Sequence, residues 1–331
     1  MGNVNFRGGY AIPRADLGEP LMEYRWEGPG PGFIGGEILT DMPVKKKSAT
    51  FPRLRIETLI DNPDTTRAKG GAYNRGNFEL EDDTYLCKNY GFEQPLDDED
   101  RENYASDFDA EMAAVMIGEH RVALARERRI AAAVFNTTTW TGASLTTDKS
   151  GTPWSTASTD WIAHVLDAVQ LVIAGSGMLP DTLIITQGTW TKLLTNEKTR
   201  AQFPGAQKIT IAMITEVLAS LCGLERILVG RSVYNTKPQG ATAAVPAFVW
   251  GNGAAGTANY AMVAKLAKPK ADPSTPCIGR SPRWEPLSSS EFVVEQYREE
   301  QTESDIFRVK NFLTEKILIP GCGHLLKIET A

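Results

Sequence analysis

The alternation of apolar and charged side chains predicts a long two-stranded hairpin within residues 46–95. Two segments show the two-residue period of a β-strand, Arg53, Leu54, Arg55, Ile56 and Glu57 in the first and Phe78, Glu79, Leu80 and Glu81 in the second. Since one strand is rich in Arg where the other is rich in Glu, cross-strand pairing favours the hairpin. A polar tip between the strands carries the basic residues Arg67, Lys69 and Arg75. A two-stranded ribbon is marginally stable alone in water, so we expect it to lie on another surface.

A helical period follows the hairpin. Between residues 97 and 135, apolar side chains recur at spacings of three and four, at Tyr104, Phe108, Met112 and Val115. Asp97 is a suitable N-cap, acidic residues gather near the start and arginines near the end, as the helix macrodipole favours. The pattern predicts a single spine helix, about 60 Å long at about 1.5 Å per residue.

The first 45 residues show neither period. They are rich in glycine and proline, and such a segment cannot bury a core of its own. Apolar side chains nevertheless recur along it, at Tyr10, Ile12, Tyr24, Trp26 and Phe33. We therefore expect an extended arm that uses these side chains as anchors on a neighbouring surface.

Beyond the spine helix, the pattern predicts a compact α/β unit. Residues 136–160 are dominated by Ser and Thr, which indicates a long loop or a crossover between domains. Helices are expected over 161–174, 190–199 and 209–221, with strands over 183–185 and 226–229 and a strand or short helix over 260–266. A proline-rich linker over 269–286 ends the unit, and a meander of three strands is expected over 292–297, 306–312 and 316–328.

Composition and charge exclude several classes of protein. The 331 residues are 42% hydrophobic and 23% charged, which is typical of a globular chain with a sizeable core. The net charge of −6 gives no overall basic footprint for reading DNA sequence. No apolar stretch is long enough to span a membrane and the start lacks a secretory signal, so we expect synthesis in the cytosol and no membrane contact. The four cysteines lie far apart, which indicates reduced thiols.

Two segments match the dinucleotide-binding pattern Gly-x-Gly-x-x-Gly, at residues 30–35 and 251–256. The pattern binds a dinucleotide only where a strand enters the loop and a helix leaves it. The first match fails because Pro31 lies inside it. The second leaves open a soluble α/β nucleotide-binding enzyme, with an exit helix over 258–268, although a plain glycine turn explains the same residues.

Catalytic and metal-binding patterns are otherwise missing from the sequence. His120, His164 and His324 fall in different predicted elements without a partner at metal-ligand spacing. The acidic run at 97–100 is explained by helix capping. We therefore expect no catalytic residue, cofactor or metal site. An arm and a ribbon that cannot stabilise themselves instead indicate a subunit that lies across copies of itself.

The order of these parts resembles that of the major capsid proteins of tailed bacteriophages, which have the Hong Kong 97-type fold. In that family an N-terminal arm, an extended hairpin called the E-loop, a spine helix and an axial domain follow one another. Local segments look similar as well, namely Asp181–Thr186, Trp190, Leu193–Asn196, Ile227–Gly230, Val233–Asn235, Tyr297–Glu300 and Ser304–Val309. The resemblance covers nearly the whole chain.

The resemblance implies an α+β capsid fold with four parts. These are an N-terminal arm at 1–45, an E-loop hairpin at 46–95, a peripheral domain with the spine helix at 96–160 that is completed by about 285–320, and an α/β axial domain at 161–284 with about 321–331. It also implies contacts between subunits through the E-loop residues Arg53, Arg55, Glu57, Arg67, Lys69, Arg75, Glu79 and Glu81. The arm anchors would be Tyr10, Tyr24, Trp26 and Phe33, and the spine helix would pack through Tyr104, Phe108, Met112 and Val115.

The function implied by this resemblance is a structural one. Such a protein assembles in the host bacterial cytoplasm as hexamers and pentamers, forming an icosahedral head that encloses double-stranded DNA without sequence specificity. Scaffold, portal and decoration proteins are its expected partners. The chain has no room for a scaffolding segment ahead of its arm, which implies a separate scaffold or none. Lys69 lies where some relatives form a covalent cross-link to Asn, but no partner Asn is identifiable, so cross-linking stays open. A shell of the encapsulin type is the rival within the same fold.

Overall fold

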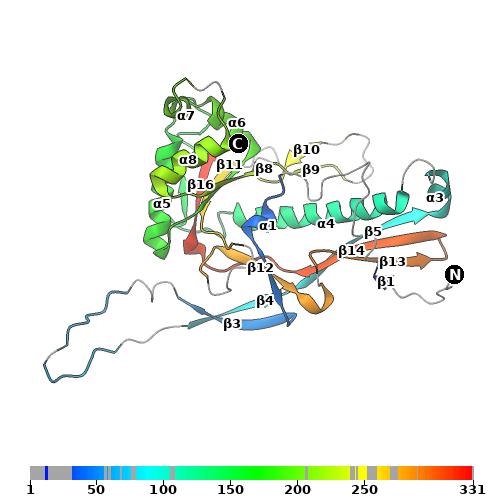
Figure 1. The fold of residues 1–331 in the computed structure, drawn as a ribbon, viewed down its shortest axis with the longest axis horizontal. Coiled ribbons are helices and arrows are strands. Elements are labelled where there is room, and N and C mark those ends of the chain that lie inside the picture. The colour runs from blue at the N-terminus through cyan, green and yellow to red at the C-terminus, as the bar shows by residue number, and fades with distance from the viewer. Residues whose placement is uncertain are drawn as a thin grey trace.

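The computed structural model describes residues 12–13, 32–55, 58, 61–67, 69–75, 80–104, 109–205, 208–238, 243, 245–251, 259–268, 275–288 and 290–329. Figure 1 shows an elongated molecule in which a lobe of helices and strands lies at one end of the long helix α4 (Ala110–Val134). A first sheet runs beside α4, and a ribbon projects away from both. The fold is therefore α+β, as predicted.

The spine helix packs on the first sheet. Its strand order is β1-β13-β14-β12-β15, with β5 paired to β14 and β2 to β12. The strands are β1 (Ile12–Pro13), β2 (Asp41–Val44), β5 (Lys88–Asp97), β12 (Gly279–Trp284), β13 (Val293–Glu299), β14 (Ser304–Leu313) and β15 (Lys316–Ile317). Helix α4 crosses β5 and β14, and Phe307 packs there with Met112 and Val115. At Gly118 a side chain would come within 2.9 Å of Val309, so this mid-helix glycine permits the close approach.

The single spine helix expected over 97–135 is confirmed from Ala110 to Val134 but is wrong in its first third. Strand β5 continues to Asp97, a short helix α3 (Asp98–Tyr104) follows, and α4 begins anew at Ala110. The side chain of Asp109 accepts a hydrogen bond from the Met112 amide, so this residue caps a second helix. The continuous part is about 38 Å long at about 1.5 Å per residue. Of the predicted packing residues, Met112 and Val115 are buried as expected, whereas Phe108 and the side chain of Tyr104 lie outside the described residues.

The second sheet forms the lobe, and the α/β pattern predicted for it is confirmed. Its strand order is β6-β16-β11-β7-β8. The strands are β6 (Thr146–Asp148), β7 (Thr182–Thr186), β8 (Arg226–Gly230), β11 (Asn259–Ala264) and β16 (Gly323–Glu329), and the helices are α5 (Trp161–Ser176), α6 (Gln187–Thr195), α7 (Glu197–Gln202) and α8 (Ile211–Cys222). The helical period of α5 buries Trp161, Val165, Val169 and Val172 against this sheet.

A second core joins the lobe to the spine helix. The end of α4 and the short helix α1 (Gly35–Ile38) pack with the opposite face of the second sheet, through residues such as Ile38, Ile130, Val134 and Met262. Close by, β9 (Val233–Asn235) and β10 (Pro246–Phe248) form a small separate hairpin.

Two expectations for the C-terminal third are corrected. The segment predicted as a proline-rich linker contains strand β12, which pairs with β2 in parallel and places Pro282 opposite Met42. The predicted meander holds only for β13 and β14. After β15 and the short 3₁₀ turn at Pro320–Cys322, β16 leaves the first sheet and pairs with β11 and β6 in the second. Another 3₁₀ turn, Glu285–Leu287, follows β12.

The predicted hairpin is confirmed for its paired strands. Strand β3 (Ser48–Leu54) pairs with β4 (Leu80–Leu86), from Ser48 opposite Leu86 to Leu54 opposite Leu80. Residues 88–95, however, belong to β5 and pair with β14. The ribbon is therefore shorter than expected, and β5 is an integral strand of the first sheet.

Candidate functional site

The base of the ribbon is held to the first sheet by charged side chains. Arg53 of β3 pairs with Glu81 of β4 at 2.5 Å and also donates to the carbonyl of Leu318. Lys316 of β15 pairs with Asp83 of β4 at 2.6 Å. The hydrogen bond from Arg53 lowers the pKa of Glu81, which keeps this carboxylate charged. These contacts fix the direction in which the ribbon leaves the body.

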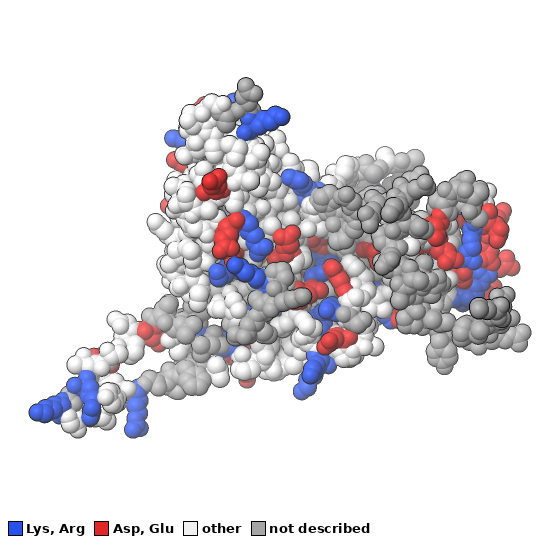
Figure 2. Space-filling view, in the orientation of Figure 1, with Lys and Arg blue, Asp and Glu red and all other residues white. Residues whose placement is uncertain are grey.

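The tip of the ribbon, residues 61–75, projects beyond the rest of the molecule (Figure 1). Its Lys and Arg side chains gather into one blue group in Figure 2. Arg67 donates through Nε to the Gly71 carbonyl at 2.7 Å, and its guanidinium lies 4.6 Å from the centre of the Tyr73 ring. Tyr73 is 70% exposed. The tip therefore presents an organised basic and aromatic surface to the solvent.

The structure brings together only some of the predicted E-loop residues. Arg53, Arg55 and Glu81 meet, because Arg55 lies 3.2 Å from the second carboxylate oxygen of Glu81. The tip holds Arg67, Lys69 and Arg75, whereas Glu57 and Glu79 lie outside the described residues. Sequence reasoning missed the pair of Asp83 with Lys316, because 233 residues separate its members.

Little of the predicted arm lies within the described residues. Ile12 and Pro13 form β1, which pairs antiparallel with β13. Tyr10, Tyr24 and Trp26 lie outside the described residues. The remaining anchor, Phe33, contacts the chain's own spine helix, where its ring meets His120 edge to face with centroids 5.6 Å apart. The arm's role toward a neighbour stays a prediction.

Glu127 of α4 joins three parts of the fold, and sequence reasoning did not single it out. Its carboxylate accepts hydrogen bonds from the amides of Ile34 and Gly35, each at 2.8 Å, and from the indole of Trp250. The residue is 3% exposed, and burial raises its pKa against the effect of these donors. A side chain at Gly35 would lie 2.5 Å from the Glu127 carboxylate, so glycine is required for the approach. Glu127 thus joins the start of α1 and the lobe to the spine helix.

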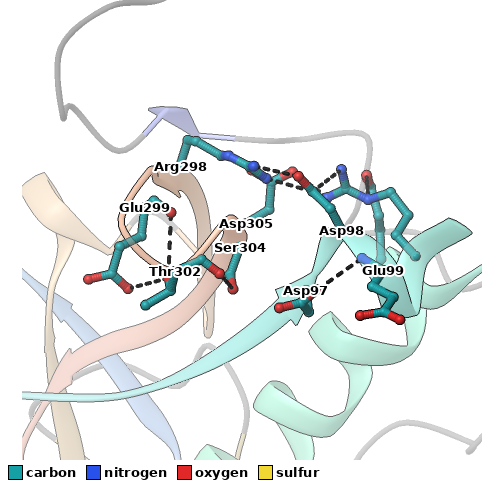
Figure 3. A network of polar contacts seen from close by, with 10 residues as sticks. Asp97, Asp98, Glu99, Arg298, Glu299, Thr302, Ser304 and Asp305 are labelled. Carbon is teal, nitrogen blue, oxygen red and sulfur yellow. Dashed lines mark hydrogen bonds and ion pairs between the residues drawn. The ribbon is translucent and has the colours of Figure 1, made fainter.

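An acidic surface lies around α3 and the β13–β14 turn, at the end of the molecule opposite the ribbon tip (Figure 1). Its exposed acids are Asp97, Glu99, Asp100, Glu102, Glu299, Glu300 and Glu303. Figure 3 shows α3 beside the β13–β14 turn, where Arg298 donates to both oxygens of Asp98, one bond being 2.6 Å long. Arg101 pairs with Asp305 in the same network. The hydrogen bonds from Arg298 lower the pKa of Asp98. These ion pairs hold the β13–β14 turn against α3.

The described residues do not support the nucleotide-binding alternative. Residues 252–258 of the glycine motif lie outside the description, but the segment after it, which the nucleotide-binding alternative requires to be a helix over 258–268, is strand β11. A strand was one of the two structures expected over 260–266. Within the described ranges, no group of three or more His, Cys, Asp and Glu residues is placed to hold a metal ion. The same part of the chain has no helix long and apolar enough to cross a bilayer.

A hollow of about 410 Å³ lies beside strands β5 and β14 of the first sheet. It is lined by Asn89, Gly91, Phe92, Glu93, Arg308 and Lys310. Its charged groups neutralise one another or their neighbours, since Arg308 pairs with Glu93 at 2.6 Å and Lys310 pairs with Glu295. These pairs leave the hollow without an activated acid, base or nucleophile.

Curated proteins with similar sequences are phage capsid proteins. The chain is 24% identical over 207 residues to the major capsid protein of Burkholderia phage BcepMu, and 22% identical over 203 residues to that of Pseudomonas phage JBD67. Each match covers 61% of this chain and 64% of the relative, so the chain matches less than two thirds of these proteins. No family model matches the chain.

Solved structures match over much more of the chain. A phage-related protein from Bordetella bronchiseptica RB50 has a TM-score of 0.66 at 18% identity, over 89% of this chain and 92% of that one. The capsid of a native GTA particle has a TM-score of 0.61 at 11% identity, over 96% and 97%. An encapsulin complex from Synechococcus elongatus PCC 7942 has a TM-score of 0.52 at 9% identity, over 88% and 85%. The chain therefore has the Hong Kong 97-type capsid fold and is similar in sequence to the major capsid proteins of tailed bacteriophages.

Proposed function

We propose that this chain is a major capsid protein, whose copies assemble as hexamers and pentamers into the icosahedral head of a tailed phage or prophage. The observation that carries the proposal is the capsid fold, which matches capsid chains such as that of the GTA particle over 96% of the sequence. The similarity to two phage major capsid proteins supports the same function. The protein would act structurally, in the virion, after assembly in the host cytoplasm.

The ribbon supports assembly on independent physical grounds. Within the described ranges its two strands pair only with each other, and an isolated hairpin is marginally stable in water. A neighbouring copy would supply the missing surface, and such a contact between different patches closes into rings or shells. The head would enclose double-stranded DNA held without sequence readout, since an acidic subunit offers no base-reading surface. Scaffold, portal and decoration proteins would be its further partners.

A deletion tests this function. The purified protein is expected to form large particles in light scattering, whereas a chain lacking residues 62–76 should stay a folded small species. Tryptophan fluorescence serves as the folding control, because buried Trp154, Trp161 and Trp250 all lie outside the deleted segment. Particles of normal size from the folded deletion variant would refute the role of the ribbon.

The contents of the particles distinguish a phage head from an encapsulin-type shell, the rival function within the same fold. The similarity to an encapsulin complex makes a shell around a protein cargo the rival function. Nuclease-protected double-stranded DNA in particles isolated from the native source supports the phage head. Particles that hold a protein cargo and no DNA would favour the encapsulin-type shell.

A further inference from the structure

A loop between α4 and α5 is attached to the core of the lobe by one buried side chain. Among residues 149–160, Trp154 alone is buried, with 1% of its surface exposed, and its ring centroid lies 5.8 Å from that of Trp161 in the lobe core. The other residues of the segment 150–159, which we call the Trp154 loop, are small, polar or proline. The apolar attachment of this loop therefore depends on how Trp154 is held.

The polar edge of the Trp154 ring is bound by a histidine. The indole Nε1 lies 3.0 Å from Nδ1 of His164, in the first turn of α5. An indole N–H can only donate, so Nδ1 of His164 accepts and carries no proton in this arrangement. A protonated imidazole carries a hydrogen on both ring nitrogens, and the indole would then face a second donor. The bond between Trp154 and His164 therefore exists only while His164 is neutral.

The charges around His164 determine the direction of its response to acid. Burial and the nearby Lys149 lower the pKa of His164 below its ordinary 6.5, whereas Asp167 and Asp160 act in the opposite direction. Lys149 is itself paired with Asp167 at 3.2 Å, so these two charges largely offset each other. Because the pKa is depressed in the folded chain, the bond to the indole is fully present above pH 6.5 and is lost as the pH falls through the lowered value.

The ends of the loop are anchored by contacts that tolerate acid. Nδ1 of His324 on β16 lies 2.9 Å from the Ser144 carbonyl, and its Nε2 lies 2.9 Å from the Thr147 hydroxyl. A carbonyl accepts and a hydroxyl can either donate or accept, so this ring keeps both contacts in either charge state. Beyond Trp154, the side-chain amide of Asn196 donates to the Thr159 carbonyl at 3.1 Å. Of these contacts, only the indole bond depends on the proton.

We propose that His164 is a pH-sensitive switch, in which protonation of Nδ1 releases the indole of Trp154 and opens the Trp154 loop between its fixed ends. A buried indole N–H left without an acceptor shifts the balance toward the open loop by about tenfold. Opening exposes the ring of Trp161, on which Trp154 packs, so acid creates an apolar surface on the lobe. The loop, its anchors and the core belong to one copy, so this inference does not rest on the proposed function.

Two variants remove the switch at its two partners. H164N retains an acceptor, because the asparagine Oδ1 takes the place of Nδ1 in the side chain, and it cannot be protonated in the same range. W154F retains an aromatic ring and removes the donor. H120N is the matched control, since His120 is a partly buried histidine on α4, where its ring contacts Phe33 instead of the Trp154 loop.

Hydrogen–deuterium exchange of the full-length chain, measured by mass spectrometry and corrected for the intrinsic effect of pH on exchange, reports opening in a subunit or a particle alike. We expect protection of residues 150–159 to fall about tenfold or more between about pH 7.5 and about pH 4.5 in the wild-type chain and in H120N. No such fall is expected in H164N or W154F. The buried strand β7 serves as the internal reference for a chain that stays folded.

Equal protection of the wild-type loop at both pH values, with β7 protected, would overturn the proposal. The same fall in a folded H164N chain would also overturn it, because the response would then come from another group. If H164N does not fold, W154F decides the matter by the same criterion. Assembly is not part of this readout, so failure of the switch and failure of the capsid function are distinguishable.

Discussion

Replacing Glu127 with glutamine removes one negative charge and one acceptor from the junction between α1, α4 and the lobe. Oε1 accepts from the Ile34 amide and the Trp250 indole, and Oε2 accepts from the Gly35 amide at 2.8 Å. If the glutamine oxygen keeps the first two donors, its NH₂ group faces the Gly35 amide, donor against donor. The opposite rotamer loses two bonds, so every orientation of the amide leaves at least one buried N–H without a partner.

The magnitude follows from that lost bond. A hydrogen bond to a charged group contributes about 1.5–3 kcal/mol, and a buried donor left without a partner costs about 1–3 kcal/mol. Removing the charge offsets part of this loss, because burial of the carboxylate is itself unfavourable, as its raised pKa indicates. We expect E127Q to lower the free energy of unfolding by about 2 kcal/mol, and E127A, which removes every acceptor, by about 4 kcal/mol or more.

Urea unfolding of the unassembled subunit, followed by tryptophan fluorescence, measures these differences. E216Q is the matched control, since Glu216 lies exposed on α8 and the same chemical change there should leave the midpoint within the error. An E127Q midpoint equal to that of E216Q would refute the assignment of Glu127 as the residue that holds this junction together.

Three further changes test other parts of the fold. The hydrogen bond from Lys327 lowers the pKa of Asp148 from 3.8 to about 2. The ionised carboxylate therefore stabilises the fold above pH 3.8, and this stabilisation is lost as the pH falls toward 2. D148N should make acid unfolding less steep in this window, and an unchanged acid-unfolding curve would contradict the pairing. Burial raises the pKa of Cys322 to about 12, so a thiol reagent should modify the partly exposed Cys222 first. Equal modification rates of the two thiols in the native protein would contradict the burial of Cys322. Among the described residues, the fully buried side-chain amide of Asn311 has no hydrogen-bond partner. N311L should therefore stabilise the chain by about 1–3 kcal/mol in thermal or urea unfolding, and a loss of stability would show that the side-chain amide is used.

Local periodicity predicted the elements whose packing partners repeat along the chain. The spacing of Trp161, Val165 and Val169 marks one face of a helix, and α5 buries that face. The alternation around Leu54 and Leu80 likewise predicted the pairing of β3 with β4. Such signals suffice because each element carries its own apolar face.

The errors arose where a partner far away in sequence determines the structure. Residues 88–95 alternate like the strand before them, and only pairing with β14 assigns them to the first sheet. Strand β16 likewise joins the second sheet through β11 and β6. Pro282 argues against a strand in the sequence, yet it lies within β12, whose backbone pairs in parallel with β2.

The candidate site was predicted unevenly for the same reason. Basic residues at a glycine-rich tip are visible in the sequence, and the structure places them at the end of the ribbon. Glu127 carries no such signal, because its donors Ile34 and Trp250 lie 93 and 123 residues away. Helix capping and the helix dipole explain the acidic run at 97–100 from the sequence. The structure adds the β13–β14 turn, which extends the acid cluster into a surface.

The most direct test of the capsid function is electron microscopy of the purified protein, combined with a mass from multi-angle light scattering. The account predicts closed shells, or rings with five or six copies, in which the ribbon of each subunit lies across its neighbour. A single monomeric species at all protein and salt concentrations, with the fold intact by circular dichroism, would contradict it.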